Sequence, residues 1–165
     1  MNSATRQAEG PVEASRTVDL DGYTHYLDVN GPDGVPPLVC VHGLGGSHTN
    51  WLGVVSELAQ DQHVYAPDLA GHGLTFPDHR GSDIDANQRL LDRCRREVSG
   101  TPAVLMGNAM GGLISILQAA RNPETVTALV LVDPAVPLPL QLPDPRVASN
   151  FLGYAVPGVG QQLLA

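Results

Sequence analysis

Three glycine-rich segments, each following an apolar run, contain the residues whose types and spacing could support chemistry. They are HGLGGSHTNW over residues 42–51, DLAGHGLT over 68–75 and GNAMGG over 107–112. A strand, a tight glycine turn and a helix in that order usually present a nucleophile at the tip of the turn. The tip of the third segment is Ala109, whose methyl group has no chemistry. The sequence therefore predicts the geometry of a nucleophilic site without its nucleophile.

The backbone around this tip can donate hydrogen bonds whatever side chain stands at position 109. A helix expected to begin at Met110 would point its first N–H groups, and the positive end of its dipole, at the tip. Backbone donors of this kind survive a change of side chain. Ser115 lies further along the same helix and cannot replace a hydroxyl at the tip.

These segments must be positioned by strands and helices that alternate along the chain. Two strands are expected first, joined by a turn at Asp21-Gly22. Apolar periodicity then predicts further strands over 38–43, 63–69, 102–108 and 126–134, with helices over 47–60, 85–98 and 110–122 between them. This alternation predicts an α/β fold with a mostly parallel, doubly wound sheet.

Composition limits the domain count, the partners and the compartment. A length of 165 residues suits one domain, with a disordered leader over 1–15, a core over 16–135 and a further segment over 136–165. The net charge of −8 disfavours nucleic acid as a partner. No stretch has the length of a membrane span or the pattern of a signal peptide, so we expect a cytoplasmic protein that does not enter membranes.

The remaining charged and sulfur-containing residues have structural interpretations. The run RCRRE over 93–97 is expected on the solvated face of a helix. Cys40 and Cys94 are expected as buried thiols, and their spacing matches no metal motif. We therefore expect no metal site.

The three segments, in this order and spacing, resemble the α/β-hydrolase family. HGLGG is similar to the family's His-Gly oxyanion loop, DLAGHGLT to its Asp-x-x-Gly-x-Gly turn with Thr75 in place of the common Ser, and GNAMGG to its nucleophile elbow. The resemblance covers residues 17 to 135 and implies the first six of the family's eight strands. It also implies that the cap, or lid, begins in the segment 136–165.

The resemblance assigns roles to individual residues. Ala109 occupies the nucleophile position, and the backbone N–H groups of Leu44 and Met110 would form the oxyanion hole. The residues implied to support these loops are His42, Gly43, Gly107 and Gly111.

Asp133, after the sixth expected strand, is a candidate acid in a minority arrangement, although Asp-Pro is also a common turn. His72 is expected to organise its loop, Asp68 to brace the AGHG turn, and Trp51 to lie in the core.

The implied parent is a cofactor-independent hydrolase with a Ser-His-Asp triad, acting on ester or C–C bonds of small apolar or carboxylic substrates. The spelling of the elbow is similar to that of the meta-cleavage product hydrolases. This chain itself is expected to be inactive, because Ala109 cannot attack a carbonyl and the family's usual acid and His segments are absent from it. The alternative is a non-catalytic ligand-binding or interaction protein on the same scaffold.

Two further expectations follow from the pattern. A nucleotide-binding domain is disfavoured, because the third glycine of a G-x-G-x-x-G motif would fall on His48. The sheet order that the resemblance implies would leave the sixth strand, TALVLVD over 127–133, as an unpaired apolar edge. We therefore expect the chain to self-associate, or to pair through this edge with a missing C-terminal segment.

Overall fold

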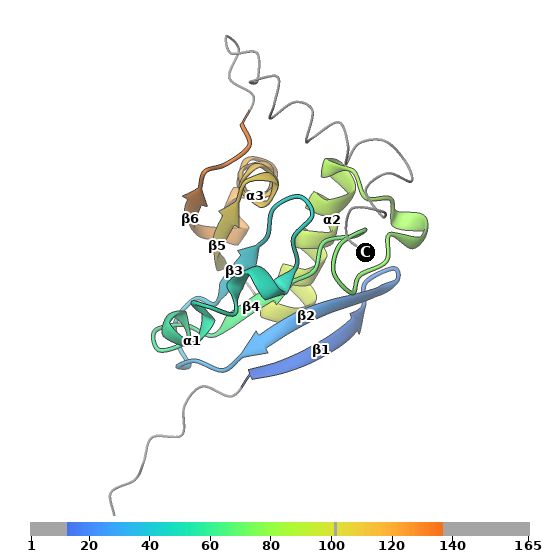
Figure 1. Cartoon of the computed structure of the whole chain (residues 1–165). Helices are drawn as coiled ribbons and strands as arrows, with labels where there is room; N and C mark the ends of the chain where they lie inside the picture. The colour runs from blue at the N-terminus through green and yellow to red at the C-terminus, as the bar shows by residue number, and fades with distance from the viewer. Residues whose placement is uncertain (1–12, 101, 137–165) are drawn as a thin grey trace, which may run out of the picture. The chain divides into compact units, whose positions relative to one another are not determined.

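The sheet that carries the glycine-rich segments has six strands in the order β1-β2-β4-β3-β5-β6 (Figure 1). The computed structural model describes residues 13–100 and 102–136, and the residues up to Ala135 form one compact unit. The strands are β1 (Glu13–Asp19), β2 (Tyr23–Val29), β3 (Leu38–Val41), β4 (Val64–Pro67), β5 (Ala103–Asn108) and β6 (Val126–Val132). Strands β3 to β6 are parallel, whereas β1 and β2 are antiparallel at one edge. The predicted α/β fold class is confirmed.

The antiparallel edge begins earlier than the sequence indicated. The turn at Asp21-Gly22 is confirmed, with positive φ angles of 61° and 128° at these two residues. Strand β1 starts at Glu13, which pairs with Val29, so the expected disordered leader over 1–15 is wrong for residues 13–15. Pairing with β2 supplies backbone hydrogen-bond partners to polar residues that show no strand periodicity. The rest of that leader, and the segment 137–165, lie outside the described residues.

Helices cover both faces of the sheet. They are α1 (Val55–Leu58), α2 (Ile84–Cys94) and α3 (Met110–Arg121), with the shorter turns η1 (His48–Trp51), η2 (Asp78–Arg80), η3 (Arg95–Ser99) and η4 (Pro123–Thr125). In the described part of the chain, none of these helices has the length and apolar character that a membrane crossing requires.

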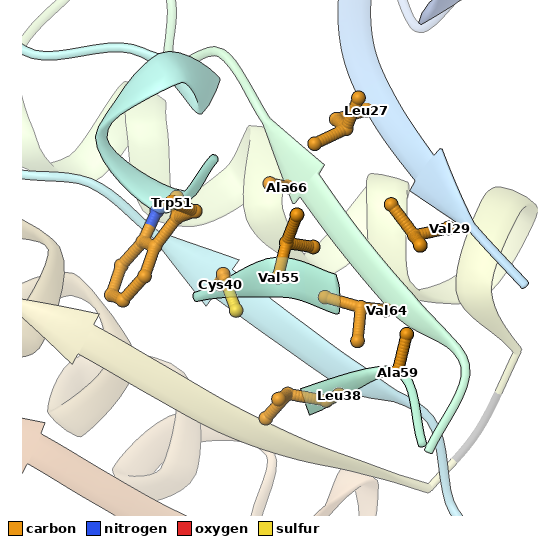
Figure 2. Close-up of a cluster of buried hydrophobic side chains, with 9 residues drawn as sticks. All are labelled: Leu27, Val29, Leu38, Cys40, Trp51, Val55, Ala59, Val64 and Ala66. Carbon is orange, nitrogen blue, oxygen red and sulfur yellow. The ribbon is translucent and has the colours of Figure 1, made fainter. Parts of the chain in front are cut away.

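Alternate residues of the central strand serve the two faces. Leu38 and Cys40 of β3 pack with η1 and α1, whereas Val39 and Val41 pack with α2 and α3. Figure 2 shows the first cluster, in which side chains from β2, β3 and β4 gather with those near α1: Leu27, Val29, Leu38, Cys40, Trp51, Val55, Ala59, Val64 and Ala66. Because β3 is buried on both faces, it is apolar at every position, as its sequence predicted.

The helix predicted over 47–60 is wrong as a continuous element. The segment forms the 3₁₀ turn η1 and then the single-turn helix α1, separated by a turn around Gly53. Ser47 caps η1 by accepting a hydrogen bond from the Thr49 amide. Trp51 is buried as expected, but the break rotates Val54 outward, where it is 47 % exposed.

The run RCRRE is only partly on a solvated face. Arg95 is fully buried, and its Nη2 donates to Asp92 Oδ1 at 3.2 Å. Arg95 is the first residue of the π-helical turn η3, which continues α2 directly after the buried Cys94. Arg96 lies outside and also pairs with Asp92.

Candidate active site

The segments after β3 and β5 meet because these strands are parallel neighbours. Val41 is paired with Gly107, which places the residues that follow each strand at the same edge of the sheet. A Cβ atom added to Gly43 would lie 3.2 Å from the Cβ of Ala109 and 3.1 Å from Oδ1 of Asn108. The loop 42–46 and the turn at Ala109 are therefore in close contact.

Ala109 has the strained backbone that the turn requires. Its φ and ψ angles are 47° and −115°, which a residue with a Cβ rarely adopts. The N–H of Ala109 donates to Val132 O at 3.1 Å, and its carbonyl accepts from the amides of Gly112 and Ala135 at 3.0 and 2.9 Å. These bonds to β6, α3 and the segment after β6 hold the strained conformation.

Glycines allow α3 to approach the sheet at this turn. A Cβ on Gly111 would lie 2.2 Å from Val41 O and 2.5 Å from His42 O. A Cβ on Gly107 would lie 2.5 Å from Gly111 O. Neither position can hold a side chain without movement of backbone, so the first turn of α3 sits directly against the end of β3.

Two amides at this junction have no acceptor among the described residues. Met110 is the first residue of α3, so its N–H has no partner within the helix. Leu44 lies in a tight turn closed by the hydrogen bond from Gly46 N–H to Gly43 O, and its own N–H donates to none of the described acceptors. The Leu44 side chain is 39 % exposed, so this turn borders solvent.

His42 fixes the loop that contains Leu44. The Leu69 amide donates to its Nε2 at 3.0 Å, so the ring proton is on Nδ1, which donates to Gly43 O at 2.8 Å. Burial lowers the pKa of His42 to about 4, because the charged ring would lose its hydration. The neutral ring therefore links, through these two hydrogen bonds, the loops that follow β3 and β4. The neighbouring His72, expected to organise its loop, lies with its Nδ1 3.2 Å from Ala70 O.

Asp68 braces its own turn, as the sequence predicted, and it also contacts His25 and His48 from two other elements. It braces its own turn by accepting from the Leu74 amide at 2.8 Å, and it also accepts from the His48 amide at 2.6 Å. Its two oxygens further contact Nδ1 of His25 at 3.1 Å and Nδ1 of His48 at 3.0 Å. Thr75, at the end of the same turn, accepts a hydrogen bond from the His25 amide.

His25 and His48 are the site residues that sequence reasoning missed. Neither lies in a motif with Asp68, since they are 43 and 20 residues from it. The available signal is the pairing of β2 with β4: Tyr26 is opposite Pro67, which brings His25 beside Asp68. That pairing depends on the sheet order and cannot be read from local spacing.

Two other candidates take no part in the described junction. Asp133 has a positive φ of 44° just after β6, is exposed, and contacts no histidine among the described residues. Ser115 is fully buried, and its Oγ donates to Gly111 O at 2.8 Å. Its hydroxyl serves the helix backbone and is not presented at the turn.

Comparison with known proteins places this arrangement among hydrolase folds. The model of a family described as alpha/beta hydrolase fold matches residues 36–165. Lipase LipV from Mycobacterium tuberculosis is 35 % identical over 108 residues, which cover 66 % of this chain and 41 % of the lipase. The 2-hydroxymuconate semialdehyde hydrolase of Pseudomonas sp. is 36 % identical over 110 residues, which cover 60 % of this chain and 36 % of the hydrolase.

A solved structure agrees with these matches. A membrane phospholipase A, described as a bacterial virulence factor, superposes with a TM-score of 0.71 and 34 % identity, over 81 % of this chain and 43 % of that one. The chain spans between about a third and a half of the length of the curated relatives it matches.

Proposed function

Since the chain belongs to the alpha/beta hydrolase fold family, we propose that its site binds the carbonyl group of a small apolar ester or carboxylic compound. The observation that carries this proposal is the elbow at Ala109, which keeps a strained backbone next to two amides without described acceptors. The Leu44 and Met110 N–H groups would donate to the carbonyl oxygen of the ligand. The lipase and the semialdehyde hydrolase among the relatives support an ester or a carbon–carbon bond adjacent to a carbonyl as the bond class.

The intact parent of this site would use a serine at the position of Ala109. Its hydroxyl would attack the carbonyl carbon, a histidine would accept the hydroxyl proton, and the two amides would stabilise the charge on the tetrahedral oxygen. Removing the nucleophile of such a triad lowers kcat on the order of 10⁶-fold. We therefore propose that this chain binds its ligand but forms no acyl-enzyme at Ala109.

Ala109 also favours a second function, a binding or interaction protein that needs no turnover. A hydrolase scaffold retains its pocket and its amides when the nucleophile is lost. The two functions differ in whether a hydroxyl at position 109 starts chemistry once an acid and a histidine are also supplied.

The test is made in a full-length context that supplies the acid and the histidine, and it compares Ala109→Ser with Ala109→Gly as a matched control that adds no hydroxyl. We expect Ala109→Ser to release p-nitrophenol from p-nitrophenyl butyrate at least tenfold faster than Ala109→Gly, and to react covalently with a fluorophosphonate. The unmodified chain should show chemical-shift changes at the Leu44 and Met110 amides when butyrate is added. If butyrate binds but Ala109→Ser releases p-nitrophenol no faster than Ala109→Gly, the result would support the binding protein. If butyrate does not bind and Ala109→Ser shows no activity, the whole proposal would be contradicted.

The compartment is a further part of the proposal. Cys40 and Cys94 are buried free thiols, and burial raises the pKa of each to about 12. Thiols that stay protonated and unpaired are compatible with the reducing cytoplasm.

A further inference from the structure

His25, His48 and Asp68 bring three metal-ligand groups together from three separate elements. His25 is on β2, His48 begins η1, and Asp68 follows β4. One ligand atom from each residue lies within 4.8 Å of the other two. Imidazole nitrogen and carboxylate oxygen are ligands that Zn²⁺ and similar divalent transition metals accept.

The spacing of each histidine nitrogen from the Asp68 oxygens is close to what a tetrahedral ion needs. Nδ1 of His25 is 3.1 Å from Asp68 Oδ2, and Nδ1 of His48 is 3.0 and 3.1 Å from the two Asp68 oxygens. Two ligands at zinc bond lengths of about 2.0–2.1 Å in a tetrahedron are separated by roughly 3.3 Å. Small ring movements would therefore convert the hydrogen-bonded arrangement into a coordinating one.

Contacts around the three residues hold them in the required orientation. Ser15 Oγ lies 2.5 Å from Nε2 of His25, the ring nitrogen that faces away from Asp68. In a coordinating arrangement this Nε2 would carry the ring proton and donate it to Ser15, which is the outer contact that ligating histidines usually make. Asp68 is oriented in the same way by the amides of His48 and Leu74.

Charge and burial also favour a cation between these groups. The Asp68 side chain has no exposed surface, and those of His25 and His48 are 6 % and 15 % exposed. A carboxylate in this position has almost no contact with water, and a divalent cation would compensate its charge.

We propose that His25, His48 and Asp68 bind one divalent transition-metal ion of the Zn²⁺ class, with a fourth position open to water on the side of His48. The ion would link β2 and the turn 68–75 to the loop that carries Leu44. We assign the site a structural role, because none of the described hydrogen bonds of the three ligands reaches Leu44, Ala109 or Met110. It departs from the expectation of no metal site, which considered the cysteine spacing alone. It goes beyond the proposed hydrolase chemistry and does not depend on it.

The test is a calorimetric titration of the full chain with ZnCl₂ after treatment with a chelator. We expect one Zn²⁺ per chain, and a thermal midpoint that rises with Zn²⁺ concentration because the ion binds the folded state. His48→Gln should weaken binding at least tenfold, and His79→Gln, which changes an exposed histidine on η2, should leave it unchanged. Ser15→Ala, which removes only the outer contact, should weaken binding by about tenfold.

A measurement without any variant covers the case in which His48→Gln fails to fold. Zn²⁺ should shift the Nδ1 ¹⁵N resonances of His25 and His48 in the unmodified chain and leave those of His42 in place. Co²⁺ should give the visible absorption of a four-coordinate site. Absence of Zn²⁺ binding, equal affinity in folded His48→Gln, or shifts confined to other histidines would each overturn the proposal.

Discussion

At the scale of single residues, the neutral imidazole of His42 holds two of the loops around the site. His42 accepts one hydrogen bond and donates another, and this arrangement is possible only without a charge on the ring. Its supporting role was predicted through the resemblance, because it directly precedes Gly43 in the loop motif. The contacts of His25 and His48 with Asp68 were not predictable, because each depends on strands or loops brought together by the sheet.

The lowered pKa of His42 predicts a loss of stability in mild acid. Its pKa is about 4 in the folded state and about 6.5 in an unfolded chain. Above pH 6.5 both states are neutral and the stabilisation is fully present; as the pH falls from 6.5 to 4, only the unfolded state binds the proton. The free energy of unfolding should therefore fall by about 3 kcal/mol over that range through this residue.

Urea unfolding of the unmodified chain and of His42→Gln at several pH values would measure this effect. The variant should start less stable but lose less stability between pH 7 and pH 4.5. The lowered pKa of Asp68 does not interfere, because its contribution is lost only below about pH 4. Parallel pH profiles for the two proteins would contradict the assignment.

At the scale of elements, the strand–turn–helix unit of β5 and α3 keeps the geometry of a nucleophile elbow although Ala109 carries no nucleophilic side chain. The pattern GNAMGG predicted this unit because glycines permit the close approach of α3 to β3. The pattern after β3 predicted a helix and failed, because apolar spacing does not report the break at Gly53. The π turn after α2, which buries Arg95, also leaves no periodic signal.

The strain at Ala109 predicts that glycine is the more stable residue there. A positive φ in a residue with a Cβ costs about 1–3 kcal/mol, whereas glycine adopts it freely at some entropic cost. Ala109→Gly should therefore raise the free energy of unfolding by about 1 kcal/mol. The same change inside α3, Ala119→Gly, should lower it by about 0.5–1 kcal/mol, and two changes of equal sign would show that the elbow is not strained.

At the scale of the whole compact unit, strand β6 forms an edge of the sheet. Among the described residues it pairs with β5 alone, and Val130, Leu131 and Val132 are each 40 to 44 % exposed. The sequence pattern predicted this apolar strand, and the family resemblance predicted its place at the edge. An exposed apolar edge strand is a template for pairing with another chain.

We expect the chain to self-associate through β6 as its concentration increases. Val130→Lys should shift sedimentation towards the monomer, because a charge on an edge strand opposes pairing. Val35→Lys, at a loop residue that is 44 % exposed, is the matched control and should not change association. This expectation would be contradicted if the unmodified chain sediments only as a monomer at every concentration.

The position of Trp51 gives the molecule a built-in optical reporter. It is the single tryptophan of the chain, its side chain is 7 % exposed in the cluster of Figure 2, and its Nε1 has no acceptor among the described residues. It also lies in η1, the turn that His48 begins. Its emission wavelength and intensity therefore report a single location, where α1 packs on the sheet next to the loop beside Asp68. A paramagnetic ion held by His48 would quench that emission directly.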